Sequence, residues 1–138
     1  MLKKKSLLLI EDDTVDAMAI KRAIDHTGEI DEMVHVINGE EGLAYLRDEN
    51  NETPFLIMLD LNMPRMNGLE FLETVKEDQT LCRIPVVVLT TSTKSCDIDG
   101  TFSHSVAGYM VKPIDYEKLV QIIQTVGDYW AINVLPAR

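Results

Sequence analysis

Apolar and polar residues alternate along this chain with two different periods. Apolar runs of strand length recur five times, and the segments between them repeat apolar residues at helical spacing. The last helical stripe, formed by Leu119, Ile122, Ile123 and Val126, follows the i, i+3, i+4, i+7 pattern of an amphipathic helix. The runs predict strands at residues 7–10, 33–37, 55–59, 86–89 and 109–111, and the stripes predict helices around residues 17–24, 40–47, 69–75 and 119–126.

The alternation of strands and helices predicts an α/β fold. Such strands form a parallel sheet with helices on both faces, and right-handed crossovers restrict the topology to a doubly wound sheet. Capping signals agree, because Asn67 with Glu70 resembles a capping box and Asp115 can cap the last helix. Residues 95–105 are rich in poor helix formers, including Gly100, so we expect a short or labile fourth helix there.

Length, charge and cysteines narrow the class of protein. A chain of 138 residues fits one domain, and 46% hydrophobic residues suffice for a core. The net charge of −10 argues against nucleic acid as a direct partner, since the phosphate backbone needs a basic surface. The apolar runs are too short to span a membrane, and we expect no signal peptide before them. Cys82 and Cys96 have no close spacing, so we interpret them as reduced thiols of a cytoplasmic protein.

Polar residues with related chemistry follow four of the predicted strands. Glu11 and Asp12 follow the first, Asp60 the third, Thr90 the fourth and Lys112 the fifth. In open α/β sheets ligands bind outside the carboxyl ends of the strands, so we expect these side chains to converge. Converging carboxylates repel one another without a counter-ion, and hard oxygen ligands suit Mg²⁺. Lys112 and Thr90 could then bind phosphoryl oxygens, with Asp60 as a carboxylate nucleophile.

Each of these residues also has an ordinary structural interpretation. The acids after the first strand, which include Asp13, could cap a helix, since acids are favoured at that end of the helix dipole. Asp60 could cap a loop, Lys112 could be solvated, and Thr90 could be an ordinary β-branched strand residue. The presence of all of them at the ends of different strands favours one shared site.

Four ordered motifs resemble those of the response-regulator receiver family. In chain order they are LLLIEDD (7–13), MLDLNMPRMNGLEFL (58–72), IPVVVLTTS (84–92) and GYMVKP (108–113). The resemblance extends from about Lys5 to Gly127. It implies a five-stranded sheet in the order 2-1-3-4-5, as in flavodoxin and the chemotaxis receiver. It also implies a single receiver domain over residues 1–138, with residues 128–138 as a C-terminal tail.

The resemblance implies a role for each residue of the predicted site. Asp60 is the expected phosphoacceptor, and Lys112 the expected phosphate-binding lysine. The expected ligands of Mg²⁺ are Glu11, Asp12, Asp60 and the backbone carbonyl of Asn62.

Further implied roles concern switching. Thr90 is the expected switch hydroxyl, and Tyr109 occupies the place of the family's rotating aromatic residue. The bond from Lys112 to Pro113 is usually cis in this family, so we expect a cis bond. Two departures are mild: Glu11 stands where many members have Asp, and Gly100 is unusual in the fourth helix.

The family resemblance implies a response regulator of a two-component signal transduction system. Such a protein accepts a phosphoryl group from a sensor histidine kinase and catalyses its own phosphorylation and dephosphorylation, and it is not otherwise an enzyme. The tail, with Tyr129-Trp130 and Leu135-Pro136, is similar to stand-alone receivers that partner bacterial phytochrome kinases. Its apolar residues suggest a homodimer through the fourth helix, fifth strand, last helix and tail. The alternative is that Trp130 extends the Leu119 stripe and packs on the core.

Three other functions fit the sequence less well. In a flavin-binding electron carrier, the acids after the first strand would repel a phosphate that lacks a metal. A phosphatase with an aspartate nucleophile would need a second Asp where Asn62 stands. A receiver-like scaffold that works without phosphorylation would be favoured by a missing phosphoacceptor, hydroxyl or lysine, and the sequence has all three.

Overall fold

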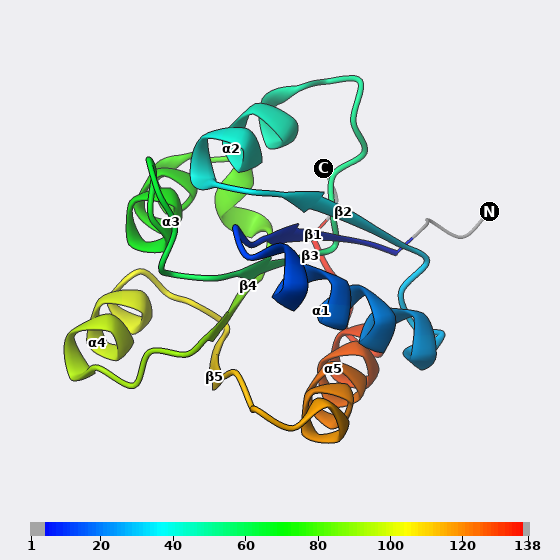
Figure 1. The fold of residues 1–138 in the computed structure, drawn as a ribbon. Coiled ribbons are helices and arrows are strands. Elements are labelled where there is room, and N and C mark those ends of the chain that lie inside the picture. The colour runs from blue at the N-terminus through cyan, green and yellow to red at the C-terminus, as the bar shows by residue number, and fades with distance from the viewer. Residues whose placement is uncertain (1–4, 137–138) are drawn as a thin grey trace.

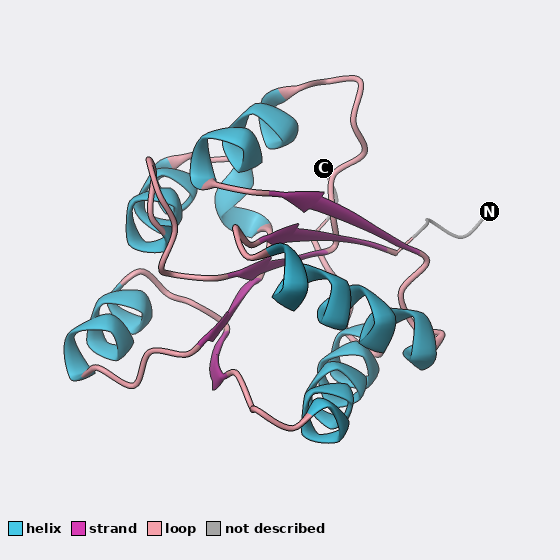
Figure 2. Ribbon diagram, in the orientation of Figure 1, coloured by secondary structure: helices cyan, strands magenta, loops and turns pink. Residues whose placement is uncertain are grey.

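The five predicted strands form one parallel sheet. The computed structural model describes residues 5–136. The sheet order is β2-β1-β3-β4-β5, and every neighbouring pair is parallel (Figures 1 and 2). The predicted doubly wound α/β fold and its strand order are confirmed. The strands are β1 (Ser6–Ile10), β2 (Glu32–Val36), β3 (Leu56–Leu59), β4 (Val86–Thr90) and β5 (Gly108–Val111).

Five α-helices cover the two faces of the sheet. One face carries α1 and α5, and the other carries α2, α3 and α4 (Figure 1). Alternate residues of each strand separate the two cores: Leu7 and Leu9 pack toward α1 and α5, whereas Leu8 and Ile10 pack toward α2 and α3. The helices are α1 (Thr14–Thr27), α2 (Gly39–Arg47), α3 (Gly68–Glu77), α4 (Ser95–Ser103) and α5 (Tyr116–Ala131), with a short 3₁₀ helix at Leu81–Arg83.

The capping predictions hold in the structure. Asn67 and Glu70 form a reciprocal capping box at the start of α3, and the Asp115 side chain accepts a backbone N–H at the start of α5. Asp13 caps α1 by accepting the N–H groups of Val15 and Asp16. The structural interpretation is therefore correct for Asp13, while its neighbours Glu11 and Asp12 remain available to a site.

The fourth helix is short, as its composition predicts. It spans nine residues, and no side chain caps its first turn. Gly100, which the sequence marks as unusual, lies under Leu69 of α3, where an added Cβ would meet a methyl carbon at 3.2 Å. The glycine therefore allows α4 to pack closely on α3, and the lability of α4 stays a prediction.

Two features near the C-terminal end differ from the expectation or refine it. No cis peptide bond occurs in residues 5–136, so the expected cis bond between Lys112 and Pro113 is wrong; the trans form is the intrinsically preferred one for X-Pro bonds. Helix α5 continues to Ala131, so the predicted tail at 128–138 begins inside a helix. Trp130 packs partly against the core, in agreement with the alternative considered for it.

No helix within residues 5–136 is long and apolar enough to cross a membrane.

Candidate functional site

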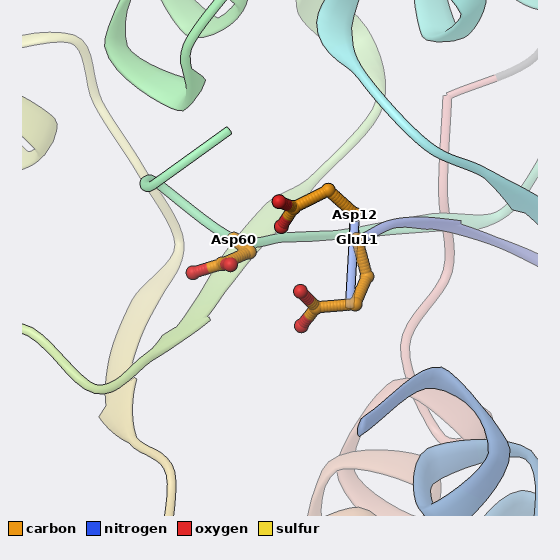
Figure 3. Close-up of side chains that lie close together, drawn as sticks. All are labelled: Glu11, Asp12 and Asp60. Atoms are coloured by element: carbon orange, nitrogen blue, oxygen red, sulfur yellow. The ribbon is translucent and has the colours of Figure 1, made fainter. Parts of the chain in front are cut away.

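Three carboxylates meet at the carboxyl edge of the sheet. Glu11 and Asp12 follow β1, and Asp60 follows the neighbouring β3, whose register pairs Ile10 with Leu59. The N–H of Asp60 donates to the carbonyl of Ile10 at 3.0 Å, which brings the two strand ends together. One oxygen from each carboxylate lies within 4.8 Å of the others (Figure 3). The predicted convergence of these side chains is thus present.

Lys112 joins the cluster from the end of β5. Its backbone N–H donates to the carbonyl of Thr90 at 2.7 Å, which extends the pairing of β4 and β5. Its Nζ lies 2.5 Å from Glu11 Oε1, 2.9 Å from Asp16 Oδ2 and 3.6 Å from Asp60 Oδ2. The side chains of Lys112, Glu11 and Asp60 are at most 10% exposed, so the ion pairs of Lys112 with Glu11 and Asp60 form largely out of contact with solvent, whereas the Asp16 side chain is 41% exposed.

The cluster holds more negative charge than one ammonium neutralises. Burial raises the pKa of Glu11 from its usual 4.5 to about 8; the hydrogen bond from Lys112 lowers it in part, and the charge of Asp60 raises it further. Burial lowers the pKa of Lys112, but hydrogen bonds to Glu11 and Asp16 outweigh it and hold that pKa above its ordinary value. Lys112 is therefore charged, while Glu11 is held back from full ionisation near neutrality.

The donor set fits a divalent cation. Three carboxylate oxygens from Glu11, Asp12 and Asp60 are hard ligands of the kind that Mg²⁺ prefers, and a cation would relieve the excess negative charge. Asp12 is exposed, so the cluster is open to solvent on its side. Asn62 is also exposed and follows Asp60 by two residues in the loop after β3. The role of its carbonyl as a ligand stays a prediction.

Thr90 and Tyr109 are linked through a residue that the sequence did not single out. Thr90 is fully buried at the end of β4, and its Oγ1 accepts the N–H of Ser92 at 3.4 Å. The hydroxyl of Tyr109 donates to the carbonyl of Ser92 at 2.9 Å, and the Ser92 hydroxyl donates to Asp97 at the start of α4. The two predicted switch residues therefore contact the same loop residue.

Two further contacts around Glu11 were missed by the sequence analysis. His35 Nε2 lies 2.7 Å from the carbonyl oxygen of Glu11. A carbonyl can only accept a hydrogen bond, so His35 carries its proton on Nε2. The N–H of Glu11 donates to the carbonyl of Val36 at 3.0 Å, so β2 fixes the backbone of Glu11 on both sides.

The loop after β3 and the first residue of α3 lie close to the phosphoacceptor candidate. A Cβ at Gly68 would lie 2.6 Å from the carbonyl oxygen of Asp60 and 2.7 Å from the Cα of Leu61. Only glycine fits there without moving the backbone that carries Asp60. Arg65 of the same loop has a φ of 65°, a left-handed conformation that favours glycine.

Comparisons with known proteins agree with the geometry. The family profile for the response regulator receiver domain matches residues 7–124. Response regulator Rcp1 of Synechocystis is 35% identical over 139 residues, covering 96% of this chain and 94% of Rcp1. The probable methanogenesis regulatory protein FilR2 of Methanothrix harundinacea is 35% identical over 127 residues, covering 90% of this chain and 82% of FilR2.

Solved structures show the same likeness. The structure of the phosphorylated cyanobacterial phytochrome response regulator RcpA superposes with a TM-score of 0.91 and is 38% identical in sequence. The match covers 98% of this chain and 100% of RcpA. The structure of the Mn²⁺-bound form of Rcp1 has a TM-score of 0.88 and 33% sequence identity, and the match covers 96% of this chain and 99% of that chain. The matched family segment contains every residue of the acidic cluster and all five strands apart from Ser6, the first residue of β1. The chain belongs to the response-regulator receiver family of two-component systems and is similar to phytochrome-associated response regulators.

Proposed function

We propose that Asp60 accepts a phosphoryl group from a phosphohistidine of a sensor histidine kinase, in a reaction that depends on Mg²⁺. The observation that carries this proposal is the convergence of Glu11, Asp12 and Asp60 within 4.8 Å, with Lys112 Nζ 3.6 Å from Asp60. In this proposal the three carboxylates and the carbonyl of Asn62 hold the cation. When bound, Mg²⁺ supplies positive charge against the phosphoryl oxygens.

Asp60 acts as the nucleophile in the proposed transfer. Its carboxylate oxygen forms a bond to phosphorus as the bond from phosphorus to the histidine nitrogen breaks, and the departing imidazole takes up a proton. Lys112 faces Asp60 with a permanent positive charge and offsets the charge on the transferred group. Attack of water on phosphorus later releases phosphate and restores Asp60. The protein is thus a phosphoacceptor that catalyses its own turnover.

The switch in this proposal runs from Thr90 to Tyr109. A phosphoryl oxygen on Asp60 could accept a hydrogen bond from the Thr90 hydroxyl. In the unphosphorylated protein this hydroxyl accepts the backbone N–H of Ser92. Movement of the loop that carries Ser92 would disturb the hydrogen bond from Tyr109. The two contacts give phosphorylation a route to the surface of α4 and β5.

A phytochrome-type kinase is the partner we propose. The support is the similarity to RcpA and Rcp1 over nearly the whole chain, since RcpA is a phytochrome response regulator. We place this exchange in the cytoplasm, where free thiols such as Cys82 and Cys96 are usual. Nucleic acid is not part of the proposal, given the net charge of −10.

A homodimer through α4, β5, α5 and the tail is a second proposal. Phe102 and Tyr129 are exposed on these helices, and Ile132 and Val134 after α5 are 81% and 97% exposed. Light scattering should show weaker association for Ile132→Ser with Val134→Ser than for the control Val15→Ser on α1. Monomeric wild-type protein, with and without a phosphate analogue, would contradict the dimer.

Labelling by a small phosphodonor tests the phosphoacceptor proposal. Wild-type protein with acetyl phosphate and Mg²⁺ should gain one phosphoryl group by intact mass, and Asp60→Asn should gain none. The control Asp25→Asn removes an exposed carboxylate on α1 and should label like the wild type. A receiver-like scaffold that works without phosphorylation would leave the wild type unlabelled.

A further inference from the structure

Asp16 contacts the candidate site from the first turn of α1. The helix cap fixes its backbone, because Asp13 Oδ1 accepts the N–H of Asp16 at 3.1 Å. Its side chain reaches the site, where Oδ2 lies 2.9 Å from Lys112 Nζ. Within residues 5–136 this is the only ion pair of the Asp16 side chain. The position of the contact is therefore set by a rigid, capped helix end.

The three carboxylates that contact Lys112 differ in what else they do in the proposed reaction. Glu11 belongs to the trio that would hold a cation, so Lys112 shares it with any metal that binds. Asp60 is the proposed acceptor of the phosphoryl group, so its charge changes in the reaction. Asp16 lies outside the acidic trio and takes no part in either task. Among the three carboxylates that contact Lys112 within residues 5–136, Asp16 is the one whose contact can stay the same during metal binding and phosphoryl transfer.

The ammonium of Lys112 can keep this contact while it binds a phosphoryl group. An ammonium carries three N–H donors, and in the structure three carboxylates surround it. The contact to Asp60 is the longest, at 3.6 Å, so a larger group on Asp60 has room to approach Nζ. Asp16 can therefore keep its contact with Lys112 Nζ while another N–H of the ammonium binds a phosphoryl oxygen.

We infer that Asp16 is a positioning residue that holds the Lys112 ammonium in place for phosphoryl transfer to Asp60. The inference rests on the proposed function, because it assigns Lys112 to the phosphoryl group. A flexible lysine would lose side-chain entropy each time it ordered on the phosphoryl group, and the contact with Asp16 removes that loss in advance.

Simple electrostatics predicts the opposite sign for the loss of Asp16. A carboxylate near the site repels the anionic phosphodonor, so removing its charge should speed phosphorylation if Asp16 acted only through its charge. If Asp16 anchors Lys112, removing it should slow phosphorylation. The direction of the change therefore separates the two roles.

The experiment compares initial rates of labelling by acetyl phosphate with Mg²⁺. Asp16→Asn should lower the maximal rate by about fivefold to tenfold, the loss expected from one half-exposed charge-assisted hydrogen bond. The Mg²⁺ concentration for half-maximal rate should change little. The control Asp25→Asn removes one charge from the same helix, away from Lys112, and should match the wild type. Asp16→Glu, which keeps the carboxylate, should recover part of the rate.

A second measurement needs neither metal nor phosphodonor. In chelator, urea unfolding of Asp16→Asn, Lys112→Met and the double variant should reveal coupling between the two residues, whereas Asp25→Asn with Lys112→Met should be additive. In the Lys112→Met background, Asp16→Asn should not slow labelling further. Asp16→Asn at or above the wild-type rate, with the wild type labelled, would overturn the inference and leave the proposed function intact. Failure of the wild type itself to label would refute the proposed function instead.

Discussion

Replacing Glu11 with Gln should remove most of the pH dependence of stability that the metal-free protein shows around neutrality. The Glu11 side chain is 1% exposed and lies beside Asp60, and its pKa in the folded protein is about 8 against the usual 4.5. A group whose folded pKa is raised favours folding in its protonated form. The contribution of Glu11 is therefore complete below pH 4.5 and is lost as the pH rises through about 8.

The size of the effect follows from the pKa difference. Each unit corresponds to about 1.4 kcal/mol, so the metal-free wild type should lose on the order of a few kcal/mol between about pH 5 and about pH 9. Lys112 adds nothing to the slope in this range, because its pKa lies above its ordinary value and its charge does not change. Glu11→Gln cannot ionise, so its stability should stay nearly level.

Urea unfolding in the presence of a chelator measures this directly. The free energy of unfolding is followed across the pH range for the wild type, for Glu11→Gln and for the control Glu73→Gln, which alters an exposed carboxylate on α3. The control should keep the slope of the wild type. A Glu11→Gln profile parallel to that of the wild type would refute the assignment of the raised pKa to Glu11.

Four further predictions follow from the structure. Mg²⁺ affinity measured by calorimetry should rise as the pH increases through about 8, since Glu11 must lose its proton to bind the metal; a flat profile would place the metal elsewhere. Gly68→Ala should destabilise the protein by about 2 kcal/mol or more in urea unfolding and impair labelling, since its Cβ would displace the backbone of Asp60; wild-type stability would contradict the crowding. Arg65→Gly should raise the free energy of unfolding by about 0.5–1 kcal/mol, because glycine adopts the left-handed φ of this position without strain. Helix α4 is short and has no side-chain cap, so it should show the fastest amide exchange of the α-helices. A destabilised Arg65→Gly variant, or slower exchange in α4 than in α2, would contradict these two expectations.

The sequence predicted the strands and the edge where the site lies because both depend on local patterns. Each predicted strand lies within one residue of the observed one, since buried parallel strands are continuous apolar runs. The convergence of Glu11, Asp60 and Lys112 followed from topology alone, because parallel strands end at one edge of the sheet. These predictions needed no knowledge of how the helices rotate.

The contacts that the sequence did not predict depend on such rotations or on backbone atoms. Asp16 meets Lys112 because the capped start of α1 points one face at the end of β5, and spacing along the chain does not encode that orientation. Ser92 contacts Tyr109 through a carbonyl, which every residue possesses. The sequence left the place of Trp130 open between the tail and the core; it packs partly on the core because α5 extends to Ala131, past residue 127, after which the predicted tail begins.

Chemical mapping of the phosphorylated residue tests the central claim most directly. An acyl phosphate on an aspartate is reduced by tritiated borohydride to homoserine, which marks the modified position for peptide sequencing. After incubation with acetyl phosphate and Mg²⁺, the label should appear at position 60 alone, and chelation of the metal should abolish it. Label at Asp12 or Asp13, or no label in protein that is folded and loaded with Mg²⁺, would contradict the assignment of Asp60 as the phosphoacceptor.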